Sequence, residues 1–170
     1  MEQKSQHVGR LPAWNGAAYA ANTAHHRAFD ADFLAATPLL PGQRVLDLGC
    51  GSGDLTAHLA ELVGPAGAVV GVDPQPSMLD EARGRARSNQ SFVLAAVQEL
   101  DRALVAEHDA SFDLVISRAV LHWVPAVDQP GVYRSAARLV RPGGHVRVEC
   151  GGVGNVANTV ALLDDVSACF

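Results

Sequence analysis

Three glycines at alternate positions form the part of the sequence best suited to bind a ligand. They lie in the run VLDLGCGSGD, which covers residues 45–54. Glycine adopts positive φ angles without steric cost and lets a ligand approach the backbone closely. A second apolar segment ends at Asp73, 20 residues beyond Gly53, and the two acceptor oxygens of a carboxylate at that distance suit the two hydroxyls of a ribose. The pattern therefore predicts a loop that binds a nucleoside.

The spacing of the glycines argues against a dinucleotide as the ligand. The dinucleotide fingerprint G-x-G-x-x-G needs glycine at position 54, where this chain has Asp54. An acid at the start of a helix also repels a pyrophosphate, which prefers the positive N-terminal end of the helix. The predicted ligand is a nucleoside without phosphates, and a nicotinamide-dependent oxidoreductase is the less favoured function.

Alternating strands and helices position these residues. Continuous apolar strands that alternate with helices imply a mostly parallel sheet with helices on both faces, and right-handed crossovers make it doubly wound. The expected strands cover residues 44–48, 69–72, 92–95, 114–116 and 145–149. The expected helices cover residues 15–36, 54–63, 78–82, 130–140 and 156–168, and a turn is expected at 142–144. The fold class is therefore α/β.

Size and charge restrict the partners of the chain. A length of 170 residues fits one domain, and the net charge is −5. Arg83, Arg85 and Arg87 follow one another on one helix and predict a solvated face, so nucleic acid is not expected as a partner. No stretch approaches the ~20 apolar residues that a membrane span needs, so no membrane association is expected.

The cysteines and the N-terminus point to the cytoplasm. Cys50, Cys150 and Cys169 are odd in number and lack the spacing of metal ligands. They are expected to be free thiols in a reducing cytoplasm, and no metal site is expected. Residues 1–13 lack the apolar core of a signal peptide and predict a mobile leader.

Four segments together resemble a known family. VLDLGCGSGDLT (45–56), VVGVDPQPSML (69–79), FDLVISRAVLHWV (112–124) and LVRPGGHVRVE (139–149) look like the successive motifs of class I S-adenosylmethionine-dependent methyltransferases, in the group related to trans-aconitate methyltransferase. The resemblance covers most of the chain. It implies a Rossmann-like sheet, S-adenosylmethionine as cofactor with S-adenosylhomocysteine as product, and a small-molecule methyl acceptor.

The resemblance also assigns binding residues. The glycine loop and Asp47 would hold the amino-acid end of the cofactor, Asp73 the ribose, and the backbone after the fourth strand the methionine portion. The family's adenine-binding acid is missing after the third strand, where Gln98 and its neighbour Val97 stand instead. For Met78 the alternative is a position in the hydrophobic core. The residues that the resemblance places against the cofactor are Tyr19, Asn22, His26, Asp47, Gly49, Cys50, Gly51, Gly53, Asp73, Pro74, Met78, Val97, Gln98, Arg118 and Ala119.

His122 is the candidate catalytic residue. It follows the fourth strand at the crevice where open parallel sheets bind ligands. Its imidazole could orient or deprotonate an acceptor. The alternative is that His122 and Trp123 pack one helical turn against the sheet.

The resemblance predicts that the C-terminal part of the domain is cut short. The family normally adds two more strands after the position of Cys150, where this chain has 20 residues left. Residues 14–37 would be a lid helix, 43–150 the cofactor-binding core and 151–170 the start of a substrate-side segment. The fifth strand is then a possible exposed edge, which favours self-association. A monomer or a weak homodimer is expected. The alternative function is a module that binds S-adenosylmethionine without turnover.

Overall fold

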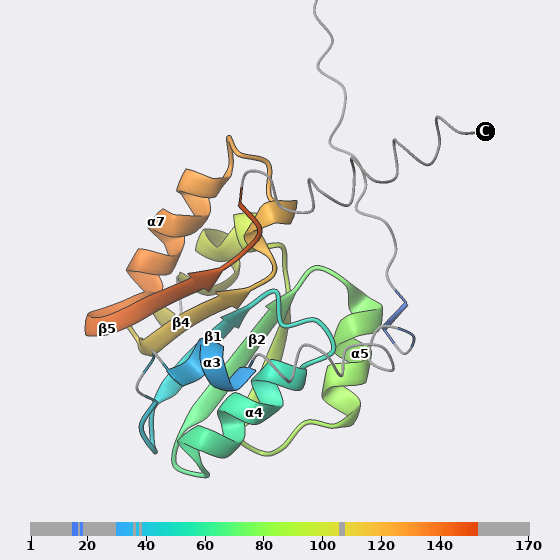
Figure 1. Cartoon of the computed structure of the whole chain (residues 1–170), viewed down its shortest axis with the longest axis vertical. Coiled ribbons are helices and arrows are strands. Elements are labelled where there is room, and N and C mark those ends of the chain that lie inside the picture. Colours follow the sequence, from blue (N-terminus) through green and yellow to red (C-terminus); the bar gives the residue numbers. More distant parts are fainter. Residues whose placement is uncertain are drawn as a thin grey trace, which may run out of the picture.

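A parallel sheet with the strand order β3-β2-β1-β4-β5 forms the centre of the computed structural model (Figure 1). The structure describes residues 15–16, 18, 30–35, 37, 39–105 and 108–152. Within them the strands are β1 (Arg44–Leu48), β2 (Ala68–Asp73), β3 (Gln90–Leu94), β4 (Phe112–Arg118) and β5 (Val140–Glu149). The helices are α3 (Asp30–Ala35), α4 (Asp54–Val63), α5 (Pro76–Gly84), η1 (Val97–Glu99), η2 (Asp101–Val105), η3 (Leu121–Trp123) and α7 (Gln129–Leu139).

The strand order reverses at β1: β2 and β3 are added on one side of it, and β4 and β5 on the other. This strand pairs with β2 on one side and with β4 on the other, and all four strand pairs are parallel. In register, Leu48 at the end of β1 lies between Val72 of β2 and Ser117 of β4. Open α/β sheets bind ligands at the carboxyl ends of the strands where the order reverses. The glycine loop leaves β1 at this place.

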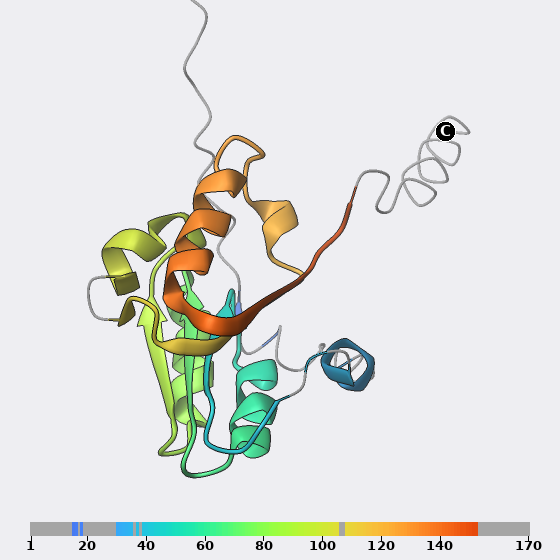
Figure 2. The ribbon, with the colours of Figure 1, turned by 90° about the vertical axis from the view of Figure 1, so that its left-hand side faces the viewer.

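Two apolar layers cover the two faces of the sheet (Figure 2). On one face, Phe33 and Leu34 of α3 and the buried residues of α4 pack on the odd-numbered positions of β1 and β2. On the other face, α7, η1 and η2 pack on the even-numbered positions of the same strands. Because side chains alternate across a strand, a strand buried on both faces is apolar throughout. The prediction of a doubly wound α/β fold is confirmed.

Most of the predicted elements that the structure describes agree with the observed ones, but β3 and β5 differ and the short helices η1, η2 and η3 were not predicted. Of the helix expected at 15–36, only residues 15–16, 18 and 30–35 are described, and 30–35 form α3. Helix α4 covers 54–63 as expected, and α7 is shifted by one residue. The expected turn at 142–144 is wrong, because β5 already begins at Val140 and a register shift opposite Phe112 and Leu114 takes up the extra residues. Gly143, with φ of +80°, lies in this irregular stretch. Strand β3 starts two residues early, at Gln90.

The described residues include a capping contact near the N-terminus and the last strand of the sheet. The Asn15 side chain accepts a hydrogen bond from the Ala18 N–H (3.0 Å), which is an N-cap contact at the start of the helix expected at 15–36. Strand β5 lies at the edge of the sheet in the described part of the chain, and Val146 on it is 42% exposed. The leader 1–13 and the helix expected at 156–168 lie outside the described residues. No helix among the described residues is long and apolar enough to cross a membrane.

Candidate functional site

The loop after β1 turns on three left-handed glycines. Gly49, Gly51 and Gly53 have φ angles of +73°, +55° and +82°. The N–H groups of Gly49 and Cys50 both donate to the Val72 carbonyl of β2, at 2.7 and 3.0 Å. Any side chain at these three positions would be strained, since only glycine adopts this backbone freely. The loop is therefore fastened to the carboxyl end of β2.

Val120 closes over the first glycine. A Cβ atom built on Gly49 would lie 2.2 Å from a Val120 methyl carbon. Val120 comes from the segment after β4, so this contact joins the two strands that flank the reversal of strand order. The absence of a side chain at position 49 is thus required by packing as well as by φ.

Asp73 joins the end of β2 to the glycine loop. Its Oδ2 accepts the Gly51 N–H at 3.0 Å and its Oδ1 accepts the Gln75 N–H at 2.9 Å. The residue is 8% exposed, and burial raises its pKa although the two N–H groups oppose the change. A carboxylate has about four acceptor sites, so each oxygen retains one for a ligand hydroxyl.

Asp47 lies under the loop rather than in it. The residue is 2% exposed, and its Oδ2 accepts the Thr56 hydroxyl at 2.7 Å. Cys50 is also buried; burial raises the pKa of its thiol well above the usual value, and the carboxylates of Asp47 and Asp73 raise it further. Cys50 is therefore a neutral thiol. Its backbone N–H donates to the Val72 carbonyl, and its own carbonyl accepts the Gly53 N–H at 3.0 Å.

The residues after β4 are held against the end of β5. Ala119 has a φ of +58°, which is unusual for a residue other than glycine. Its N–H donates to the Glu149 carbonyl at 2.7 Å, and the Arg118 guanidinium contacts the Glu149 carboxylate at 3.2 Å. His122 is exposed, and its Nδ1 accepts the Gly151 N–H at 3.3 Å. These contacts fix the segment that flanks the crevice.

The residues predicted near the adenosine have unequal exposure. Met78 and Val97 are 5% and 4% exposed, and Val97 belongs to the hydrophobic core. Pro74 is half-buried and Gln98 is exposed. Gln98 is thus open to solvent, whereas the side chains of Met78 and Val97 are buried.

The lid residues Tyr19, Asn22 and His26 lie outside the described residues. Nearby, Gly16 packs closely on α5, since a Cβ there would be 2.3 Å from the Ser77 carbonyl oxygen. This contact brings the start of the predicted lid segment to the helix that follows Asp73.

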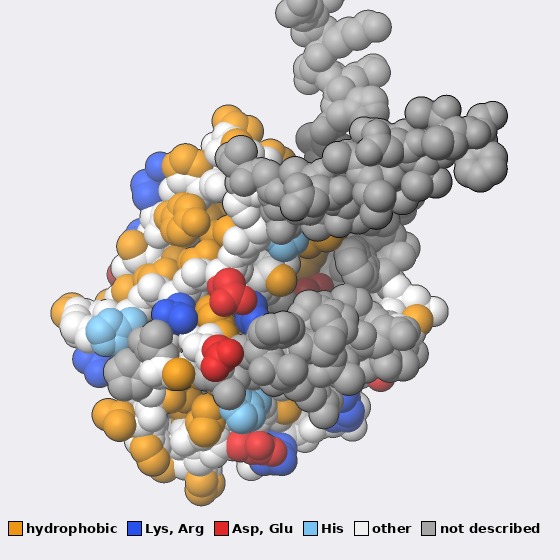
Figure 3. All heavy atoms as spheres, in the orientation of Figure 1, with side chains coloured by type: hydrophobic (Ala, Val, Ile, Leu, Met, Phe, Trp, Pro, Cys, Tyr) orange, Lys and Arg blue, Asp and Glu red, His pale blue; other side chains and the backbone are white. Residues whose placement is uncertain are grey.

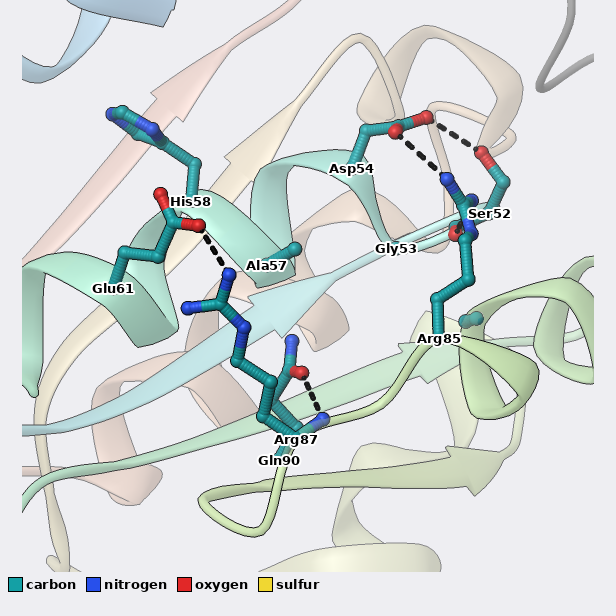
Figure 4. A pocket seen from close by; sticks show the side chains of 10 residues that line it. Ser52, Gly53, Asp54, Ala57, His58, Glu61, Arg85, Arg87 and Gln90 are labelled. Atoms are coloured by element: carbon teal, nitrogen blue, oxygen red, sulfur yellow. Dashed lines mark hydrogen bonds and ion pairs between the residues drawn. The ribbon is translucent and has the colours of Figure 1, made fainter. Parts of the chain in front are cut away.

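The prediction that Arg83, Arg85 and Arg87 share one helix is wrong, because α5 ends at Gly84 and only Arg83 lies on it. Arg85 and Arg87 follow the helix and form ion pairs along a cavity of about 340 Å³ (Figure 4). The Arg85 guanidinium contacts Asp54 at 3.3 Å and the Ser52 carbonyl at 2.7 Å, and Arg87 contacts Glu61 at 2.5 Å. The cavity lies beside α4, away from the carboxyl ends of β4 and β5. On the face shown in Figure 3, acidic and basic side chains lie close to one another.

Sequence reasoning missed Thr56 and Val120, and it missed the contacts of Arg85 with Asp54 and Ser52. Thr56 could have been found, because it is a polar residue on the buried side of an amphipathic helix, two positions after Asp54. Val120 and Arg85 had no local signal. In the described parts of the chain, no group of three or more His, Cys, Asp or Glu side chains is placed to hold a metal ion.

Comparison with known proteins identifies relatives of one kind. A family model described as "Methyltransferase domain" matches residues 45–144. An uncharacterized methyltransferase of Schizosaccharomyces pombe is 33% identical over 152 residues, covering 88% of this chain and 56% of that protein. Trans-aconitate 2-methyltransferase of Deinococcus radiodurans is 36% identical over 118 residues, covering 69% of this chain and 42% of that one.

A solved structure supports the same relationship. The arsenic(III) S-adenosylmethionine methyltransferase of Chlamydomonas reinhardtii superposes with a TM-score of 0.62 and 35% identity, over 75% of this chain and 46% of that one. The chain thus spans about half the length of the relatives that it matches. The matched region contains the glycine loop, Asp73 and the segment after β4.

Proposed function

The chain belongs to the methyltransferase-domain family, whose cofactor is S-adenosylmethionine, and we propose that it transfers a methyl group from that cofactor to a small-molecule acceptor. The acceptor is a carboxylate or a hydroxyl, and the reaction is an in-line displacement at carbon. The relatives are named as methyltransferases, which favours turnover over a module that only binds the cofactor.

The observation that carries this proposal is the junction between Asp73 and the glycine loop. The Gly51 N–H to Asp73 Oδ2 hydrogen bond of 3.0 Å fixes the carboxylate beside the backbone that a ligand must approach. Each carboxylate oxygen keeps one acceptor site, which matches the two hydroxyls of a ribose. The residues present therefore fit the nucleoside part of the cofactor.

The other residues of the site divide the remaining tasks. The backbone of Gly49 to Gly51 and of Arg118 and Ala119 would hold the amino-acid portion, and Gln98 would take the place of the family's adenine-binding acid. When bound, S-adenosylmethionine supplies a methyl group on a sulfonium, which is a good leaving group. The protein then mainly aligns the acceptor and excludes water.

We propose that the acceptor is a small molecule and that the protein works in the reducing cytoplasm. The relatives include enzymes named for trans-aconitate and for arsenite, so the family accepts chemically different small molecules. The exposed free thiol of Cys150 suits the cytoplasm, where thiols stay reduced. We propose a monomer or a weak homodimer; β5 is a sheet edge in the described part of the chain, and such an edge favours weak self-association.

A calorimetric titration with S-adenosylhomocysteine tests the proposal. We expect binding in the micromolar range, and no binding of NAD as the control ligand. Asp73→Asn should weaken binding at least about tenfold, since a hydrogen bond to a charged group contributes about 1.5–3 kcal/mol. Asp80→Asn is the matched control, because the Asp80 side chain is 77% exposed on α5. Equal affinities of the two variants would show that Asp73 does not contact the ribose.

A further inference from the structure

We propose that His122 binds the methyl acceptor as a hydrogen-bond donor through its Nε2–H, and that the accepting atom is a carboxylate oxygen. The inference rests on the proposed methyl transfer and deepens it in two ways. It replaces the general-base role considered for His122, and it selects the carboxylate from the two acceptor classes.

The ring nitrogen that faces the backbone determines the role of His122. The Gly151 N–H donates to His122 Nδ1 at 3.3 Å. A nitrogen that accepts a hydrogen bond carries no proton, so the neutral imidazole carries its proton on Nε2. Nε2 is then a donor. It cannot take a proton from an acceptor, and Nδ1 is already occupied.

The segments that follow two neighbouring strands, β4 and β5, hold the His122 ring in position. His122 belongs to η3, directly after β4, and Gly151 follows the end of β5. The Ala119 N–H to Glu149 carbonyl bond (2.7 Å) holds the two segments together. The ring therefore keeps Nδ1 toward the backbone, and Nε2, one ring carbon away, points away from the Gly151 N–H.

Trp123 adds a flat apolar surface beside this donor. Its ring centroid is 5.2 Å from that of His122, and the residue is 56% exposed. Large exposed aromatic side chains with a polar neighbour are typical of ligand sites. A small organic acid can place its carbon skeleton on the indole while an oxygen accepts the Nε2–H.

The chemistry of a carboxylate agrees with a donor at this position. A carboxylate oxygen uses its lone pair to form the bond to the methyl carbon as the carbon–sulfur bond breaks, and the electron pair of that bond stays on sulfur. The ester product has no proton to lose. A hydroxyl acceptor would instead have to pass a proton to a base, which His122 in this tautomer cannot be.

The tautomer can be measured without turnover. In protein with nitrogen-15-labelled histidine, long-range proton–nitrogen spectra at neutral pH should show His122 Nδ1 unprotonated and Nε2 protonated. Gly151→Ala keeps the N–H and should keep this tautomer, whereas Gly151→Pro removes the N–H and should yield a mixture of both. A proton on Nδ1 of the wild type, or identical spectra of the two variants, would overturn the proposal.

Substitutions of His122 separate a donor from a base. Glutamine places an amide N–H near the position of Nε2, whereas asparagine reaches only the position of Nδ1. With a panel of carboxylic acids that includes trans-aconitate, we expect kcat/KM to fall by no more than about tenfold in His122→Gln and by about 10- to 100-fold in His122→Asn. A loss of about 10²–10⁴-fold in both variants is the signature of a general base and would contradict the proposal.

The two proposals fail in different ways. If S-adenosylhomocysteine does not bind, the proposed function is wrong, whatever the tautomer is. If it binds and His122 carries its proton on Nδ1, only the donor role is wrong. Preferential methylation of phenols or alcohols over carboxylic acids by the wild type would also refute the donor role while leaving methyl transfer intact.

Discussion

Gly49→Ala tests whether the glycine loop is shaped by packing as well as by backbone angle. A φ of +73° costs an alanine about 1–2 kcal/mol. The new Cβ would also lie 2.2 Å from a Val120 methyl carbon, and overpacking of this kind costs about 1–3 kcal/mol. The expected loss in the free energy of unfolding is therefore about 2–5 kcal/mol.

Gly42→Ala is the matched control for the backbone part. Gly42 has a φ of +86°, and a Cβ there would meet nothing within 4 Å. Its substitution should cost only the strain of about 1–2 kcal/mol. The difference between the two variants measures the contact with Val120.

Urea denaturation followed by circular dichroism gives each free energy, with the slope checked for constancy. In the double variant Gly49→Ala/Val120→Ala, the two Val120 methyl carbons at 2.2 and 2.7 Å are removed and only the Cβ of residue 120 stays close, at 3.0 Å, so the two costs should not add. We expect the double variant to be more stable than the sum of the single effects predicts, by about 1–3 kcal/mol. Equal losses for Gly49→Ala and Gly42→Ala, with additive behaviour of the double variant, would refute the packing argument.

Three further predictions concern charge and thiol chemistry. Burial raises the pKa of Asp73, and the ionised carboxylate is the form that binds the ribose hydroxyls. As the pH is lowered, affinity for S-adenosylhomocysteine should therefore begin to fall above the usual aspartate pKa of 3.8. Calorimetry at several pH values checks this, and a fall only below 3.8 would contradict it. Burial of Asp113 favours a higher pKa, but hydrogen bonds from the Arg44 N–H (2.7 Å) and the Arg141 guanidinium (2.6 Å) outweigh it and lower the pKa. Asp113→Asn should therefore lower the free energy of unfolding at pH 7 by about 1–3 kcal/mol. Urea titrations at several pH values should show that this loss shrinks as the pH falls from 3.8 through the lowered pKa. A loss that does not change with pH would argue against this. Iodoacetamide should modify Cys150, which is exposed, faster than Cys50, whose buried thiol has a raised pKa; mass spectrometry of the peptides decides, and equal rates would mean that the loop opens.

The elements of the fold could be predicted because their signals are local. The limits of β1 and α4 follow from an apolar run, three glycines and an amphipathic segment that are continuous in the sequence. The turn expected at 142–144 failed for a tertiary reason. Pairing with β4 extends β5 back to Val140, and a register shift accommodates Gly143. Proline and glycine indicate a turn locally, but pairing with a neighbouring strand can override them.

The sequence by itself determined the chemistry of the loop and of Asp73, since residue types and their spacing define a backbone that only glycine can form and a carboxylate placed to meet it. Only the tertiary structure decided how the other side chains act. Val120 closes on Gly49, and Gly151 sets the proton of His122, because the sheet brings together segments that are far apart in the chain. Such contacts depend on strand order and packing, which no local pattern encodes.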